Sequence, residues 1–328
     1  MQKSIYLFLA ISFAFITSCK QEDSAADIKM GFVEGTVYAN IAGKTISGAS
    51  VYVIYESVTY QTVSDTAGFF RLEAPVGHHQ LHIQTGAGKL FQSIIEIDIT
   101  ENQTTTLTNL QSKLTQSGEI AFVPGQYDAI QNIITNSLGY TITPIGSGEL
   151  SSLTAMQQFD AIFINCGALD LYDSLSYANL AQYITDGGSI YVSDWAVSYL
   201  TGIHTGDCNR PLGFIDDTKL CSSKSGSSVM MPGTIVAPDF QAFMGINTMN
   251  IYYDLNQWEI IQSFDATYWE VVVAGNGLPA LMLRKSDFSN GTSTGNSGNI
   301  YFTTFHNDPN GNINQDMQHM LEFVILNL

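Results

Sequence analysis

The chain has 328 residues and a formal net charge of −18; 45% of its residues are hydrophobic and only 13% are charged. This length favours two domains, and the hydrophobic share excludes an intrinsically disordered chain. The negative charge argues against nucleic acid and anionic membrane surfaces as partners, because both require cations on the protein.

The first 18 residues form a predicted export signal. Lys3 provides a basic start, an apolar run follows from Ile5 to Ile16, and small residues lead to Cys19. The run has the length of a signal-peptide core and is too short to span a bilayer. The sequence Ile16-Thr17-Ser18-Cys19 resembles the lipobox of bacterial lipoproteins, in which the signal is removed and the cysteine is lipidated.

This resemblance implies a protein of the cell envelope, anchored to the outer membrane by lipid on Cys19, with residues 19–30 as a tether. Several acyl chains on one cysteine give a lasting anchor, whereas one chain anchors only marginally. Lys20 followed by acidic residues resembles a signal for export to the cell surface. The alternative for this segment is the start of a solvated linker. The alternative for the lipobox is an ordinary secretory signal with an incidental cysteine.

Residues 31–113 predict a small all-β sandwich, because short alternating runs are separated by turn residues. The expected strands are 33–38, 50–55, 69–73, 80–84 and 94–99. Several motifs resemble the carboxypeptidase regulatory-like domain, a prealbumin-like fold related to carbohydrate-binding domains: Gly35-Thr36-Val37, Ile46-Ser47-Gly48-Ala49-Ser50-Val51, Asp65 with Gly68-Phe69-Phe70, and Pro75-Val76-Gly77. The resemblance implies a spacer or accessory module without catalysis.

Residues 114–328 predict an α/β domain, because apolar strands alternate with segments of helical periodicity. We expect a flavodoxin-like three-layer fold with a mostly parallel sheet and an irregular insertion at about 203–298. Added strands are expected within this insertion at 249–253, 258–261, 270–273 and 281–284. The expected elements before the insertion are strands at 120–123, 140–143, 160–165 and 188–192 and helices at 130–138, 150–157, 177–184 and 195–200. A strand at 299–305 and a helix from 317 close the chain.

Ligands of open α/β sheets bind beyond the carboxyl ends of the strands. Cys166, Asp194 and His306 each follow such a strand. The layout resembles the class I glutamine amidotransferase-like superfamily, in which a cysteine nucleophile occupies a tight strand-to-helix elbow and a later strand ends in histidine. Here the elbow reads Val192-Ser193-Asp194-Trp195-Ala196, so the usual cysteine and its small neighbours are replaced and the thiol mechanism is predicted to be lost.

Three hypotheses remain for this edge. In the first it is not catalytic, with Asp194 as a helix cap and His306 as a hydrogen-bonding anchor. In the second, Ser193 or Asp194 forms a hydrolytic pair with His306, and Cys166 is a further candidate. In the third, the edge binds a glycan or peptide without chemistry; its predicted ligand-facing residues are Gly167, Tyr172, Trp195, Tyr199 and Asn307.

Other residues carry separate predictions. Cys208 and Cys221 are expected to form a disulfide in an oxidising compartment, and Cys166 is expected to be a buried thiol. Oxygen-bearing residues after the last strand, Asp308, Asn310, Asn312 and Asp316, are a weak calcium candidate that departs from the usual loop spacing. His78 and His82 share a strand face, where surface histidines and a metal site are both conceivable.

The sequence therefore predicts an acidic, lipid-anchored envelope protein that requires no cofactor and acts by binding or scaffolding. A glycan or another envelope protein is the expected partner, and a hydrolase or amidase is the alternative. A functioning elbow requires small residues around its nucleophile, and Trp195 argues against the alternative.

Overall fold

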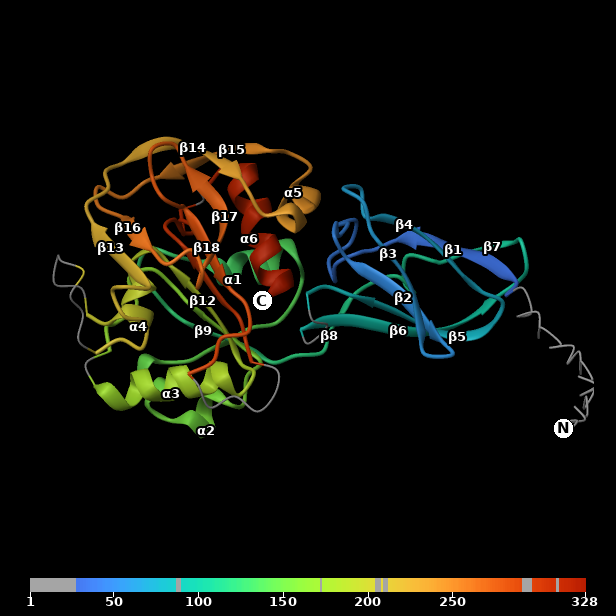
Figure 1. The fold of residues 1–328 in the computed structure, drawn as a ribbon, viewed down its shortest axis with the longest axis horizontal. Coiled ribbons are helices and arrows are strands. Elements are labelled where there is room, and N and C mark those ends of the chain that lie inside the picture. Colours follow the sequence, from blue (N-terminus) through green and yellow to red (C-terminus); the bar gives the residue numbers. More distant parts are fainter. Residues whose placement is uncertain are drawn as a thin grey trace, which may run out of the picture.

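The computed structural model describes residues 28–86, 90–171, 173–203, 208, 212–290, 297–310 and 313–328. These residues fold into two lobes that lie side by side, with strands β1–β8 in the first lobe and all of the helices labelled in the second (Figure 1). Within the described ranges, no helix combines the length and apolar character needed to cross a membrane.

The first lobe contains two sheets around an apolar interior. Its strands are β1 (Met30–Thr36), β2 (Ser50–Tyr55), β3 (Val58–Val63), β4 (Phe69–Pro75), β5 (Gly77–Gln84), β6 (Phe91–Ile99), β7 (Thr104–Thr106) and β8 (Thr115–Gln116). One sheet has the order β4-β1-β7 and the other β3-β2-β5-β6-β8. Alternate residues of β1 and β4 are buried, as expected for strands with one face in a core. Since β8 pairs with β6, this lobe extends past the predicted boundary at residue 113.

Strand β3 was missed by the sequence analysis. It is an edge strand that pairs only with β2, and none of its six residues is buried. An edge strand without a buried face lacks the alternating apolar pattern on which the prediction depends.

The second lobe is built on a nine-stranded sheet of order β10-β9-β11-β12-β19-β18-β17-β14-β15. Its first half is parallel and comprises β10 (Thr143–Pro144), β9 (Ile120–Val123), β11 (Ala161–Ile164), β12 (Ser189–Ser193) and β19 (Ile300–Thr303). Its second half is antiparallel and comprises β18 (Met282–Lys285), β17 (Glu270–Gly275), β14 (Val229–Ile235) and β15 (Thr248–Tyr253).

The prediction of a mostly parallel sheet was therefore wrong: the sheet is mixed. The segment predicted as an irregular insertion supplies the whole antiparallel half, together with a separate two-stranded antiparallel sheet of β13 (Leu220–Lys224) and β16 (Glu259–Phe264). Antiparallel strands need only short connections, so four of them can extend an existing sheet within one insertion.

Helices cover both faces of the sheet. They are α1 (Ile130–Asn132), α2 (Leu153–Met156), α3 (Ser174–Thr185), α4 (Ser198–Thr201), α5 (Pro238–Met244) and α6 (Gln315–Asn327). A π-helical turn (Ile133–Ser137) continues α1, and 3₁₀ turns precede α2 (Ser147–Ser151) and α4 (Asp194–Val197). Ile162 and Ile164 of β11 join the core beneath α3, whereas Ala161 and Phe163 join the core that includes α6.

The two lobes share one of these cores. Buried residues of the first lobe belong to the same apolar cluster as α5 and α6. At the contact, the rings of Phe91 and Tyr140 lie 4.2 Å apart, and Lys44 Nζ is 2.6 Å from Glu322 Oε2. Because apolar contact continues across the boundary, the lobes form one packed body.

Candidate functional site

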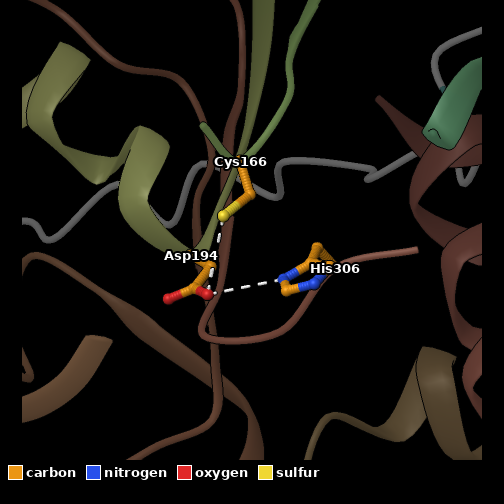
Figure 2. A group of neighbouring side chains, drawn as sticks. All are labelled: Cys166, Asp194 and His306. Atoms are coloured by element: carbon orange, nitrogen blue, oxygen red, sulfur yellow. Dashed lines mark hydrogen bonds and ion pairs between the residues drawn. The ribbon is translucent and has the colours of Figure 1, made fainter. Parts of the chain in front are cut away.

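Three strand ends of the parallel half place the predicted site residues together. Cys166 follows β11, Asp194 follows β12, and His306 lies three residues beyond β19. These strands are adjacent in the sheet, so their carboxyl ends meet at one edge. Figure 2 shows the three side chains converging there. All three are buried.

Asp194 is at the centre of this group. The Cys166 thiol donates to Asp194 Oδ2 over 3.6 Å, and His306 Nδ1 is 3.4 Å from the same oxygen (Figure 2). His306 Nε2 is 3.1 Å from Oδ1 of Asp254, which follows β15. Sulfur, nitrogen and oxygen donors of Cys166, His306 and Asp194 all lie within 4.8 Å of one another, so this group could hold a metal ion.

The backbone at Asp194 adopts a conformation that is unusual for a residue with a side chain. Its φ is +47°, in the left-handed region, which costs free energy for any residue except glycine and is found often at functional sites. Its Oδ1 accepts a hydrogen bond of 2.7 Å from the backbone N–H of Glu259. The prediction that Asp194 caps the next helix was wrong, because the 3₁₀ turn that begins there has no side-chain cap.

Ser193 faces a different partner. Its hydroxyl donates to the carboxylate of Asp128 and accepts a hydrogen bond of 2.9 Å from the backbone N–H of Cys166. Asp128 also accepts a bond of 3.2 Å from the backbone N–H of Asn307. These bonds join three of the strand ends, so Ser193 and Asp128 support the edge.

The charges of the cluster follow from burial and from the ion contacts. Burial raises the pKa of Asp194 and of Asp128. Burial and the neighbouring Asp194 raise the pKa of the Cys166 thiol to about 12. Burial by itself lowers the pKa of His306, but contacts with Asp194 and Asp254 outweigh it and hold this pKa well above 6.5.

The contact with His306 also changes the pKa of Asp254, which lies on the outer side of the ring. Burial raises the pKa of Asp254, but His306 outweighs that effect and the net shift is downward. At neutral pH the cluster therefore holds a cationic His306 beside the Asp254 carboxylate. Cys166 is then a neutral thiol, whereas a cysteine nucleophile must be a thiolate.

The predicted ligand-facing residues divide into two groups. Trp195 is half-buried beside Tyr127, with ring centroids 5.1 Å apart, and Lys224 Nζ lies 4.2 Å above the Trp195 ring. Gly167 is close by, since a Cβ there would lie 2.7 Å from Tyr127. Tyr127, Gly167, Trp195 and Lys224 are called the aromatic rim below. Tyr172 lies outside the described residues.

Two of the predicted rim residues are not ligand-facing. Tyr199 is only 1% exposed, and its hydroxyl donates to the Leu169 carbonyl. Asn307 is 6% exposed, and its side-chain amide donates to the Ala129 carbonyl over 2.6 Å. Both predictions were wrong because the sequence places Asn307 after a strand and Tyr199 in a helix but does not show which way either side chain turns.

The prediction of a hydrogen-bonding His306 needs a similar correction. The ring nitrogens of His306 approach Asp194 and Asp254, but neither contact has the alignment of a hydrogen bond. The ring is therefore held by charge.

The remaining predicted sites have separate outcomes. The disulfide between Cys208 and Cys221 is present, and Cys166 is a buried free thiol. Cys19 and Asn312 lie outside the described residues. In the calcium candidate, Asp308 Oδ1 accepts from both nitrogens of Asn310, and Asp316 lies in the first turn of α6, which Asn314 caps.

The two histidines of β5 have different neighbours. His78 Nδ1 is 2.9 Å from Asp98 Oδ1, and His78 Nε2 is 3.3 Å from Glu96 Oε2. His82 instead stacks on the Tyr52 ring, with centroids 4.8 Å apart.

Three acidic residues of this edge were missed by the sequence analysis: Asp128, Asp254 and Glu259. Asp254 directly follows the strand predicted at 249–253, and its place at a strand end could have identified it as a candidate site residue. The strand was expected to be part of an irregular insertion, so its end was not placed with those of the parallel strands.

Comparison with known proteins identified no matching family model and no matching curated protein. Solved structures with similarity include a candidate GMP synthase component from Thermoplasma acidophilum, at 12% identity and a TM-score of 0.38, covering 63% of this chain and 94% of that one. The glutaminase domain of Trypanosoma brucei CTPS with bound acivicin is similar at 12% identity and a TM-score of 0.38, and the match covers 64% of this chain and 93% of that domain. A candidate ThuA-like protein from Bacteroides uniformis is similar at 9% identity and a TM-score of 0.37, and the match covers 63% of this chain and 89% of that one.

Proposed function

We propose that this chain is a lipid-anchored cell-envelope protein that binds a ligand and does not turn over a substrate. The observation that carries the proposal is the state of Asp194, at the strand-to-helix elbow. Its side chain is fully buried, one oxygen accepts from Glu259 and the other faces both Cys166 and His306. Groups engaged in this way are not presented to a substrate.

The aromatic rim supports a binding role. Half-buried aromatic rings at the carboxyl edge of a sheet offer flat apolar surfaces with a polar end, which suit stacking against a sugar ring. Lys224 above Trp195 adds a cation at the same surface. A glycan of the cell envelope is therefore the ligand class that we propose.

The anchor is the second part of this proposal. The Ile16-Thr17-Ser18-Cys19 sequence supports lipidation of Cys19, and Lys20 with the acidic residues after it supports a location in the outer membrane facing the surface. We expect the chain to incorporate labelled palmitate when expressed in a bacterium with the lipoprotein pathway, and the Cys19→Ser chain to incorporate none. Equal labelling of both chains would overturn the anchor.

The binding proposal is tested by a glycan array followed by titration of the bound glycan. We expect Trp195→Ala to weaken binding at least tenfold. Tyr268→Ala is a matched control, since its ring also lies near lysine ammonium groups, at 5.1 and 5.3 Å, but at the opposite edge of the sheet. No bound glycan, or equal binding by the Trp195→Ala chain, would contradict the proposal.

A hydrolase is the second candidate, and one observation favours it. Asp194 has the strained backbone of an elbow nucleophile, and His306 lies between it and Asp254. In this mechanism the Asp194 carboxylate would attack a carbon atom, displace a leaving group and form an ester. Above the raised pKa of His306, where the imidazole is neutral, His306 would remove a proton from the water that hydrolyses the ester. Asp254 would orient His306.

The two candidates are separated by a panel of activated esters and haloalkanes. We expect the same background rate from the unaltered chain and from the Asp194→Asn chain. Turnover that disappears in both Asp194→Asn and Asp254→Asn, while Tyr268→Ala retains it, would establish the hydrolase.

A further inference from the structure

The cluster at the strand ends has the donor set of a transition-metal site. A thiol, a carboxylate and an imidazole from Cys166, Asp194 and His306 are the three ligand types that zinc takes in proteins. They come from three separate strand ends, so the sheet fixes their relative positions. The sulfur excludes calcium and magnesium as the preferred ion, since both select oxygen ligands.

Two of the three distances between the donors match the edges of a zinc tetrahedron. With a Zn–S bond of about 2.3 Å and Zn–N and Zn–O bonds of about 2.0 Å, a tetrahedron has S···O and O···N edges of roughly 3.5 and 3.3 Å. The observed edges are 3.6 Å from Cys166 Sγ to Asp194 Oδ2 and 3.4 Å from that oxygen to His306 Nδ1. The third edge is within 4.8 Å.

The histidine gives the second, independent indication. Its side chain is only 4% exposed, yet neither ring nitrogen has a hydrogen-bonding partner of acceptable geometry among the described residues. Such burial is costly for a polar group without that compensation. Figure 2 shows the ring directed at Asp194, so the nitrogen points into the cluster.

Asp254 completes the arrangement around the histidine. A metal-binding histidine usually donates its other ring N–H to a carboxylate, which fixes the ring and its tautomer. His306 Nε2 is 3.1 Å from Asp254 Oδ1, on the side of the ring away from the other donors. The contact lacks hydrogen-bond alignment as it stands, and a small rotation of the ring on metal binding would direct the N–H at this carboxylate. Asp254 is therefore a positioning residue for the site.

We propose that Cys166 Sγ, Asp194 Oδ2 and His306 Nδ1 bind one Zn²⁺ ion and that Asp254 orients His306. On binding, the thiol proton and the Nδ1 proton of His306 leave to solvent, and a water molecule takes the fourth position. The thiolate and carboxylate charges cancel the charge of the ion, so the loaded site is neutral, as burial requires. This inference does not depend on glycan binding or on lipidation.

The test uses the full chain with Cys19→Ser, in which Cys166 is the remaining free thiol beside the Cys208–Cys221 disulfide. After chelator treatment and dialysis, we expect one Zn²⁺ per chain by elemental mass spectrometry and a melting temperature that rises with zinc concentration. With Co²⁺ in place of zinc, a sulfur-to-cobalt charge-transfer band is expected. It should be absent from the Cys166→Ser chain.

Two further variants separate a built site from adventitious binding by an acidic protein. Asp254→Asn keeps all three ligands and should weaken zinc binding about 10–100-fold, the usual effect of removing such a partner. His78→Gln removes an exposed histidine that also lies between two carboxylates, and it should leave zinc binding unchanged. Both variants are checked for a folded circular dichroism spectrum.

The results that overturn the inference are equally definite. They are a full chain that retains no zinc, a cobalt complex without the sulfur band, a band that persists in Cys166→Ser, or equal zinc affinity in Asp254→Asn and the unaltered chain. None of these would affect the glycan experiment, so the two proposals fail separately.

Discussion

Two histidines of this chain lie between two carboxylates, one at the surface of the first lobe and one inside the second. His78 contacts Asp98 and Glu96 at 2.9 and 3.3 Å, and His306 contacts Asp254 and Asp194 at 3.1 and 3.4 Å. The distances are similar, but the side chains are 66% and 4% exposed. From this difference we expect burial, more than contact distance, to decide what each histidine contributes to stability.

The largest expected effect comes from removing each histidine in metal-free protein. His306→Ala leaves Asp194 and Asp254 without their cation, and a buried charge that loses its partner costs about 3–5 kcal/mol. His78→Ala should leave the unfolding free energy unchanged, because water replaces an exposed partner. Urea denaturation of both variants measures the contrast. Equal losses of stability would remove the distinction.

The second largest expected effect comes from neutralising one carboxylate beside each histidine, Asp254 beside His306 and Asp98 beside His78. Asp254→Asn removes an ion-pair partner of a buried ring. Because Asp254 is itself partly exposed, the change should cost less than the loss of His306, about 1–3 kcal/mol. Asp98→Asn is the matched change at the surface, and we expect it to be neutral. Calorimetric unfolding of the two variants, compared with the unaltered chain, tests whether the outer partner of His306 is a stabilising group.

The third prediction concerns pH. The pKa of His306 is held well above 6.5 in the folded chain, so its contribution is complete below about pH 6.5 and is lost as pH rises through the folded value. From pH 6.5 to 8, stability should fall by up to about 1.4 kcal/mol per pH unit. Burial also raises the pKa of Asp194, so any proton that Asp194 releases between pH 6.5 and 8 likewise lowers the stability of the fold as pH rises.

The His306→Gln chain is the control for this pH dependence. Its unfolding free energy should vary less between pH 6.5 and 8 than that of the unaltered chain, and His78→Gln should not reduce the slope to the same degree. A slope that is the same in all three chains would mean that His306 does not carry the effect.

The smallest effect is a response to salt. The pKa of His78 is raised by a hydrogen bond and charge attraction from Asp98 at the surface, where the screening length falls from about 10 Å at 0.1 M to about 3 Å at 1 M. Added salt should therefore move the pKa of His78 toward 6.5 and leave that of His306 in place. NMR titration of the two imidazole ring protons measures both. A pKa of His306 that also changes with salt would indicate that solvent reaches the cluster.

Much of the second lobe could be predicted because its parallel strands are short apolar runs. Every residue of β9, β11, β12 and β19 is buried, and strands covered on both faces carry such runs. The positions of Cys166, Asp194 and His306 after these strands followed from the same pattern. The direction in which a side chain points depends on its neighbours in space, and so the bonds of Ser193 to Asp128 and Cys166 and the burial of Tyr199 and Asn307 were not predicted.

The sequence by itself determined the order of most elements, the residues that follow the parallel strands and the Cys208–Cys221 pair, because these depend on local pattern and short spacing. Only the tertiary structure decided that the antiparallel strands extend the same sheet, that Asp254 meets His306 and that the two lobes share a core. Such contacts join residues far apart in the chain, and their geometry is fixed by how complete elements pack against one another.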